Sequence, residues 1–543
     1  MELPRFDFPE GVLARLAARD GSLFSDDPAV AAEATAYMGW TDLAAQASQT
    51  LPLVEALVAD VKAEPLTDVV LLGMGGSSLA TLVLSRLLPG DGTRMHVLDT
   101  TSPVTIAATL EAVDPATTLF ILASKSGGTV EPNALYTIFR SHADGALGRE
   151  AAGRRFIAIT DPGSSLERLA ADDGMRACVL APPNVGGRYS ALTVFGLVPA
   201  ALIGVDVRRL ISFAHAMEEG LQDGEPPQLA HLMASGHAAG RDKLTILAPE
   251  EFRVFGLWVE QLVAESLGKH GRGVVPLVVH QTSTLRSARA DETLIAINAS
   301  DPTVCLPDGD LPLLAFELAD PHELGGWFVL WEYSVALVGC ALRVNAFDQP
   351  NVAEAKAATN AMLDGSLQAP ASQGGERGFE LTFASRLEAP PQADHISVIG
   401  AVSQALDSLH PGDYLCVLAF LPDDQTALEP LLSATDSIGI ARNVGTAFGL
   451  GPRYLHSTGQ LHKGGPNTGV FIVVTSRDTR DAEIPGWPFT LGELHRAQAE
   501  GDLATLAAHG RRALRIDLPD ADPTTVRALA ELLERASRSH QGE

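Results

Sequence analysis

Short apolar runs rich in β-branched residues recur along the first part of the chain, about 25 to 35 residues apart. They lie at Val69–Leu72, Met95–Leu98, Leu119–Ala123, Phe156–Thr160 and Ala177–Leu180. Helical stretches separate most of these runs, and such alternation predicts a parallel sheet covered on both faces. Residues 1 to about 65 have the pattern of helical packing segments. We therefore expect a first α/β domain over residues 1–205.

A second, smaller α/β domain is expected over residues 206–363. Leu244–Leu247 and Leu294–Ile297 have the composition of buried strands. Phe255–Leu267 has the pattern of a helix, and Trp327–Leu342 that of a long apolar one. The repeated strand and helix signals again favour a layered α/β arrangement.

A linker rich in Gly, Pro, Ser and Gln, residues 364–379, opens the last part of the chain. Beyond it, Tyr414–Phe420 and Val470–Val474 predict buried strands. The tail, residues 490–537, is expected to be largely helical. Residues 364–543 are thus predicted to form a C-terminal α/β extension with a helical tail.

Glycine- and hydroxyl-rich loops follow two of the strands predicted in the first domain. They are Gly73-Met-Gly-Gly-Ser-Ser78 and Ser124-Lys-Ser-Gly-Gly-Thr129. Glycine lets the backbone approach an anion, and the N–H groups of a following helix point at it. Neither loop fits the dinucleotide fingerprint or the P-loop. Their matched positions predict a monophosphate ligand at the carboxyl edge of the sheet.

Composition and charge narrow the classes of partner. The chain is 46% hydrophobic with a formal net charge of −28, which disfavours nucleic acid and anionic membranes as partners. The four cysteines are scattered without a Cys-x-x-Cys pair, so neither a zinc site nor a disulfide scaffold is predicted. We see no signal peptide and no apolar run of the ~18 residues that a membrane span needs. A cytoplasmic protein is expected.

Two further clusters hold residues suited to proton transfer and charge stabilisation. Arg188 follows two glycines in Asn184–Ser190, and a guanidinium carried there could stabilise a developing oxyanion. Glu265 is expected at the C-terminal end of a helix, a position that suits a general base. Taken alone, Arg188 could instead be a surface arginine in a loop, and Glu265 a solvated surface glutamate.

Two more clusters lie further along the chain. Asp348-Gln-Pro-Asn351 predicts the start of a helix that carries Lys356 about two turns along. Tyr454–Pro466 is a glycine-rich, irregular segment that contains His456, His462 and Lys463.

Together the clusters resemble the glucose-6-phosphate isomerase family. Gly-Gly-Arg-Tyr-Ser190 resembles its arginine signature, Glu265-Ser-Leu-Gly-Lys269 its catalytic glutamate segment, and Phe347-Asp-Gln-Pro350 its lysine-helix segment. The two glycine-rich loops resemble its phosphate loops. The segment around His456 and the tail are closer to the isomerase half of fused transaldolase/glucose-6-phosphate isomerase proteins, although no stretch of this chain is left to form a transaldolase barrel.

The resemblance implies two sugar-isomerase type, doubly wound parallel-sheet lobes and the interconversion of glucose 6-phosphate and fructose 6-phosphate through a cis-enediolate. It assigns catalysis to Glu265 as base, Arg188 as enediolate stabiliser, and His456 with Lys356 in ring opening. The substrate phosphate would be held by Gly76, Ser77, Ser124, Lys125, Ser126 and Thr129. No metal or organic cofactor is implied, and a homodimer with shared active sites is expected.

The order of motifs leaves the ring-opening histidine open. Common short members of the family place His-Ser-x-Gly-Gln between the glutamate and lysine segments, whereas His456-Ser-Thr-Gly-Gln460 follows both. His456 is favoured over His462 and His280. A dual glucose/mannose phosphate isomerase and a non-catalytic sugar-phosphate sensor are alternative functions. A glutamine-hydrolysing aminosugar isomerase is disfavoured, because it would need an N-terminal cysteine and the first is Cys178.

Overall fold

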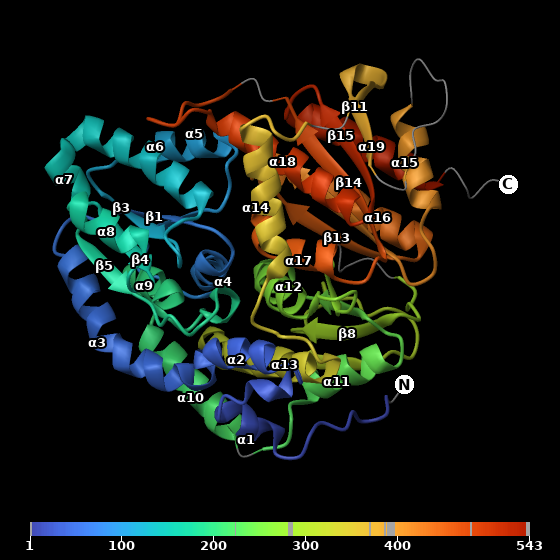
Figure 1. Ribbon diagram of the computed structural model, residues 1–543, viewed down its shortest axis with the longest axis horizontal. Coiled ribbons are helices and arrows are strands. Elements are labelled where there is room, and N and C mark those ends of the chain that lie inside the picture. Colours follow the sequence, from blue (N-terminus) through green and yellow to red (C-terminus); the bar gives the residue numbers. More distant parts are fainter. Residues whose placement is uncertain are drawn as a thin grey trace.

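The computed structural model describes residues 3–538, apart from 223, 281–285, 369–370, 385–386, 388–396 and 478–479. Three sheets, each dominated by parallel strands, organise these residues. In Figure 1 the first sheet lies on the left, the third at the upper right, and the second below the third. This arrangement confirms the α/β class expected from the alternating pattern.

The first sheet has five parallel strands in the order β2-β1-β3-β4-β5. The strands are β1 (Asp68–Gly73), β2 (Arg94–Leu98), β3 (Thr118–Ala123), β4 (Phe156–Thr160) and β5 (Ala177–Leu180). All five confirm predicted runs: the inner strands β1, β3 and β4 are fully buried between helical layers, and the edge strands β2 and β5 are partly exposed. The helices of this part are α1 (Val12–Ala17), α2 (Pro28–Ala36), α3 (Leu43–Val61), α4 (Leu79–Leu87), α5 (Pro103–Ala112), α6 (Val130–Leu147), α7 (Arg149–Gly153), α8 (Ser165–Asp172) and α9 (Val194–Leu202).

The second sheet has four parallel strands in the order β7-β6-β8-β9. They are β6 (Lys243–Leu247), β7 (Val275–Val278), β8 (Glu292–Ile297) and β9 (Leu313–Phe316), and the helices are α10 (Val207–Gln222), α11 (Gln228–Ala238), α12 (Arg253–Leu267) and α13 (Leu324–Leu342). The sequence pattern predicted β6, β8, α12 and α13 but missed β7 and β9, which are only four residues long.

The third sheet has six strands in the order β10-β11-β15-β14-β12-β13, with β10 and β11 antiparallel to their neighbours. The strands are β10 (Gln373–Gly374), β11 (Glu380–Ala384), β12 (Tyr414–Phe420), β13 (Gly445–Leu450), β14 (Gly469–Ser476) and β15 (Arg512–Leu518). The helices are α14 (Pro350–Leu363), α15 (Val398–Asp407), α16 (Gln425–Arg442), α17 (Gly459–Gly464), α18 (Leu491–Ala508) and α19 (Pro523–Arg538).

The tail, residues 490–537, is largely helical as expected, but it also contains a strand that the sequence pattern did not predict. Strand β15 runs between α18 and α19 and pairs with β14 on one side and β11 on the other. Its charged residues conceal it in the sequence. In the structure they are buried but partnered: Arg515 pairs with Glu500 at 3.2 Å, and Asp517 accepts a 2.6 Å hydrogen bond from Thr475.

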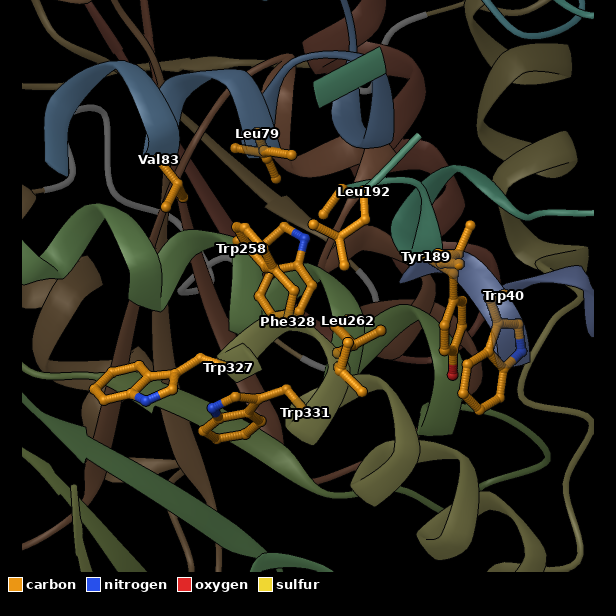
Figure 2. Close-up of a cluster of buried hydrophobic side chains, with 14 of the residues drawn as sticks. Trp40, Leu79, Val83, Tyr189, Leu192, Trp258, Leu262, Trp327, Phe328 and Trp331 are labelled. Atoms are coloured by element: carbon orange, nitrogen blue, oxygen red, sulfur yellow. The ribbon is translucent and has the colours of Figure 1, made fainter. Parts of the chain in front are cut away.

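Aromatic packing joins the first two sheets through α12 and α13 (Figure 2). Trp40 stacks on Tyr189 with ring centroids 5.0 Å apart, and Trp258 of α12 meets Phe328 of α13 edge-on at 4.7 Å. These contacts fix one face of α12 and the turn that carries Arg188. The core of the first lobe therefore sets the frame of the candidate site.

The expectation that no segment is long and apolar enough to span a membrane needs correction. Residues 321–342 meet the length and composition of a span, but 89% of the apolar window is buried inside the protein. This segment contains α13, a core helix packed on α10, α11 and α12. One such buried helix is weak support for a membrane location.

Candidate active site

The two glycine-rich loops lie at the point where the strand order of the first sheet reverses. One follows β1 and the other follows β3, and these strands are neighbours in the sheet. In an open α/β sheet, ligands bind outside the carboxyl ends of strands at such a switch point. The structure therefore brings together the two loops that the sequence predicted to hold a phosphate.

The loop after β1 lies in close contact with two other segments of the site. Gly75 has a φ of +55°, and a Cβ added there would lie 2.5 Å from the carbonyl oxygen of His456. A Cβ on Gly76 would lie 2.2 Å from the carbonyl carbon of Gly187. Glycine is needed at both positions, because any side chain would force the segments apart. Ser77 is next to them and half-buried.

Arg188 is buried, with 2% of the residue exposed, and its guanidinium is fully engaged. It belongs to the short 3-10 helix η4 (Gly187–Tyr189). Its Nε donates to Ser266 Oγ at 2.9 Å and its Nη1 to Gln349 Oε1 at 2.9 Å. Its Nη2 donates to the carbonyls of Ala346 and Asp348 at 2.6 and 2.8 Å. The sequence alternative of a free loop arginine is wrong.

Glu265 lies in the last turn of α12 and faces Arg188. Its Oε1 is 3.1 Å from Arg188 Nη1, and its Oε2 accepts a 3.1 Å hydrogen bond from Gln261 Nε2. Its side chain is 10% exposed, so it is not a solvated surface glutamate. Gln261 also donates to the carbonyl of His456 at 2.8 Å, which links α12 to the C-terminal part of the chain.

Lys269 adds a second buried cation beside this pair. Its Nζ contacts Asp348 Oδ1 at 2.6 Å and donates to the carbonyl oxygens of Asp348, at 2.7 Å, and Asn345. Burial lowers the pKa of Lys269 to about 7, and the nearby charge of Arg188 acts in the same direction. The carboxylates of Asp348 and Glu265 act in the opposite direction, but burial has the larger effect.

His456 reaches the first lobe from the end of η8 (Arg453–His456). Its Nε2 is 2.8 Å from Glu131 Oε1, and Gln498 Nε2 donates to the same oxygen at 2.7 Å. Burial alone would raise the pKa of Glu131, but the charge and hydrogen bond of His456 outweigh it, so this pKa is lowered. Glu131 lies in the first turn of α6, which follows the second glycine-rich loop.

That second loop has its hydroxyls near the start of α6. Ser124 is buried and its Oγ lies 3.3 Å from Thr129 Oγ1, while Ser126 is exposed. Lys125 turns away to Asp161, with its Nζ 2.6 Å from Oδ2. The ammonium group is therefore already paired, although it lies in the predicted loop.

Lys356 is exposed on α14, and its charge contributes to lowering the pKa of Glu131. Two other histidines lie elsewhere. His462 is buried with its Nε2 3.9 Å from Cys416 Sγ, and burial lowers its pKa well below the usual value. Burial also lowers the pKa of His280 to about 4, and its backbone N–H donates to Asp436.

Sequence reasoning gave no role to several groups that complete the arrangement: Glu131, Gln261, Lys269, Gln349, Arg453 and Gln460. Gln261 had a signal, since it lies four residues before Glu265 on one helix face. Glu131 had a weaker one, an acidic residue in the first turn of a helix. Among the described residues, no group of three or more His, Cys, Asp or Glu side chains gathers as a metal site.

A family model described as "Phosphoglucose isomerase" matches residues 53–286. A glucose-6-phosphate isomerase of Parasynechococcus marenigrum is 31% identical over 352 residues, which are 55% of this chain and 64% of that protein. One of Rubrobacter xylanophilus is 31% identical over 284 residues, 49% of this chain and 63% of that protein. The chain thus spans slightly under two thirds of these relatives. A glucose-6-phosphate isomerase of a Cyanothece species is 29% identical over a match that covers 61% of this chain and 73% of that protein.

Solved structures give weaker likenesses. A glucose-6-phosphate isomerase of Chlamydia trachomatis has a TM-score of 0.49 at 18% identity, covering 65% of this chain and 78% of that one. A hypothetical protein of Thermus thermophilus has a TM-score of 0.42 at 20% identity, and the match covers 97% of this chain and 88% of that one.

The residues matched by the family model contain both glycine-rich loops, the turn of Arg188 and the helix of Glu265. These are the segments that the structure brings together at the switch point of the first sheet and the end of α12. By sequence, this region of the chain is therefore similar to phosphoglucose isomerases.

Proposed function

We propose that this protein interconverts glucose 6-phosphate and fructose 6-phosphate through a cis-enediolate. The observation that carries the proposal is the buried contact of 3.1 Å between Glu265 and Arg188, next to the glycine-rich loop after β1. A carboxylate base beside a fixed guanidinium is the pair that proton abstraction next to a carbonyl requires.

Ring opening is the first step. His456 gives a proton to the ring oxygen while the anomeric hydroxyl releases its proton to a water molecule, so the bond from C1 to the ring oxygen breaks and the C1 carbonyl forms. The hydrogen bond between His456 and Glu131 supports this role, because it fixes the orientation of the imidazole ring. Lys356 assists from α14.

Proton transfer follows on the open chain. Glu265 takes the proton from C2 and returns it to C1, while a proton moves from the oxygen on C2 to the oxygen on C1. Negative charge develops on the enediolate oxygens, and Arg188 lies where it can stabilise that charge. The sugar phosphate is assigned to Gly76, Ser77, Ser124, Ser126 and Thr129, and Lys125 of the same loop would have to leave Asp161 to reach it.

A coupled assay of the purified protein with fructose 6-phosphate tests this function, with mannose 6-phosphate as a parallel substrate. We expect conversion of fructose 6-phosphate to glucose 6-phosphate. Binding of the sugar phosphate without turnover would contradict the proposal and favour a sensor, and formation of mannose 6-phosphate would indicate the dual specificity. The homodimer implied by the resemblance and the cytoplasmic location expected from the sequence remain predictions.

A further inference from the structure

Arg453 is the first residue of the short helix η8, which ends at His456. Its Nε donates to Asp99 Oδ2 at 2.8 Å and its Nη2 to Asp99 Oδ1 at 2.7 Å. The same Nη2 donates to Asp423 Oδ2 at 2.7 Å. The paired hydrogen bonds to Asp99 fix both the distance and the plane of the guanidinium, which a single point contact cannot do.

The pair joins parts of the chain that are far apart in sequence. Asp99 directly follows β2 of the first sheet, whereas Arg453 belongs to the part of the chain that carries the third sheet. Asp99 is 1% exposed and the Arg453 side chain 14%. A buried ion pair gives little net stability over apolar packing, because both charges lose their hydration. What this pair contributes is a defined position of η8 against the first lobe.

Asp99 also connects to the loop after β1. Ser78 Oγ lies 3.1 Å from Asp99 Oδ2 and 3.1 Å from the carbonyl oxygen of Gly75. Gly75 in turn lies against the carbonyl oxygen of His456. Asp99 is therefore in contact both with the turn that ends at His456 and with the loop to which the substrate phosphate is assigned.

We propose that Arg453 is a positioning residue: its paired hydrogen bonds with Asp99 hold η8 so that His456 reaches Glu131, and they tie this turn to the loop after β1. The consequence for catalysis rests on the proposed function. Loss of the pair misplaces His456 and slows ring opening. The proton transfer by Glu265 on an already open chain is affected much less, because α12 is held by the core that joins the first two sheets.

Three variants test the proposal on the full chain: Arg453→Gln, Arg453→Lys and the control Arg442→Gln. Arg442 belongs to the same C-terminal part and pairs with Asp407 at 3.2 Å, away from the site. With glucose 6-phosphate, which is almost entirely cyclic, we expect Arg453→Gln to lower kcat about 10- to 100-fold, the range for a displaced catalytic group. The kcat of Arg453→Lys should lie between those of the parent and of Arg453→Gln. The kcat of Arg442→Gln should equal that of the parent.

A second measurement separates positioning from a general loss of structure. Arabinonate 5-phosphate, an open-chain analogue of the enediolate, should bind Arg453→Gln with nearly unchanged affinity. Equal losses of kcat and of analogue affinity would overturn the proposal, as would parent-like kcat in Arg453→Gln. Thermal unfolding of each variant confirms that it is folded.

A third readout does not depend on turnover. The ring ¹⁵N signals of His456, assigned with a His456→Asn variant, report its contact with Glu131. We expect them to shift in Arg453→Gln and to stay in place in Arg442→Gln. Unchanged signals in Arg453→Gln would overturn the positioning role whatever the activity. Absence of turnover in the parent protein would instead contradict the proposed function, with the ring signals still deciding the role of Arg453.

Discussion

The guanidinium of Arg188 illustrates how single residues define this site. Of its five polar contacts, two are with Glu265 and Ser266 of α12 and three are with the segment just before α14. Each donor has a fixed acceptor, so the charge is held in place before any substrate arrives. Preorganised charge of this kind stabilises a developing oxyanion without further rearrangement.

Replacing Arg188 by lysine should therefore not be conservative. Lysine keeps the charge but has one donor group where Arg188 uses Nε, Nη1 and Nη2, so the partners Ser266 and Gln349 lose their contacts. We expect kcat to fall by about 100-fold or more, in the range for loss of an oxyanion-stabilising donor, with a smaller change in KM. Steady-state kinetics check this, with Arg272→Lys, an exposed arginine beyond α12, as the control. A variant with parent-like kcat would contradict the role of Arg188.

At the scale of elements, α12 joins the core to the site. Trp258 and Leu262 face the aromatic cluster of Figure 2, while Gln261 and Glu265 face Arg188 and His456. The helix also carries Glu260, which lines a small cavity with Cys416 and His462. Burial raises the pKa of Glu260 to about 8, so this carboxyl group is protonated at neutral pH.

The raised pKa of Glu260 predicts a pH-dependent stability. Between its ordinary value of 4.5 and about 8, the folded protein holds a proton that the unfolded chain has released. The free energy of unfolding must then decrease as pH rises through this window, by up to about 1.4 kcal/mol per pH unit. Glu260→Gln removes this titration, so the variant should gain stability relative to the parent as pH rises.

Urea unfolding of both proteins at several pH values between 5 and about 8 measures this difference. The control is Glu251→Gln, which changes an exposed glutamate just before α12. A difference between Glu260→Gln and the parent that does not change with pH would show that Glu260 titrates normally.

The elements differ in how readily the sequence shows them. Strands β1, β3 and β4 are continuous apolar runs because both faces of the sheet are covered. Strand β15 is hidden because its charged residues find buried partners, and β13 because it is a half-buried edge strand with two glycines. Such strands depend on contacts that form only in the folded protein.

The same limit applies to the candidate site. Glu265 and Arg188 are recognisable from their local motifs. Glu131 could not be paired with His456 in advance, because the two residues are 325 positions apart in the chain. The contacts of His456 with the first lobe arise only when the third sheet packs beside the first two.

At the scale of the whole molecule, one chain brings His456 into contact with the segments that carry Glu131 and Glu265. His456 comes from the C-terminal part and contacts Glu131 and Gln261 of the same chain. Gln460 strengthens this junction, since its Nε2 donates to the carbonyl of Gly268 at 3.0 Å and to Asn351 Oδ1 at 2.7 Å. The expectation of active sites shared between two subunits is therefore not required by the geometry.

Activity should then be independent of association between chains. We expect constant specific activity over a dilution series that takes the protein from its associated to its dissociated state, as followed by light scattering. The physical reason is that no catalytic contact has to be supplied by a second copy. Activity that falls in step with the associated fraction would show that a partner chain contributes to the site.

The most direct test of the account is the fate of the C2 proton of glucose 6-phosphate in D₂O, followed by NMR for the parent and for Glu265→Gln. The parent should convert the substrate and place deuterium at C2 of the remaining glucose 6-phosphate and at C1 of the product. Glu265→Gln should lose both reactions by about 10²- to 10⁴-fold, the contribution of a general base, while still binding the sugar phosphate. Isomerisation or exchange at the parent's rate in Glu265→Gln would contradict the central claim that Glu265 transfers the proton.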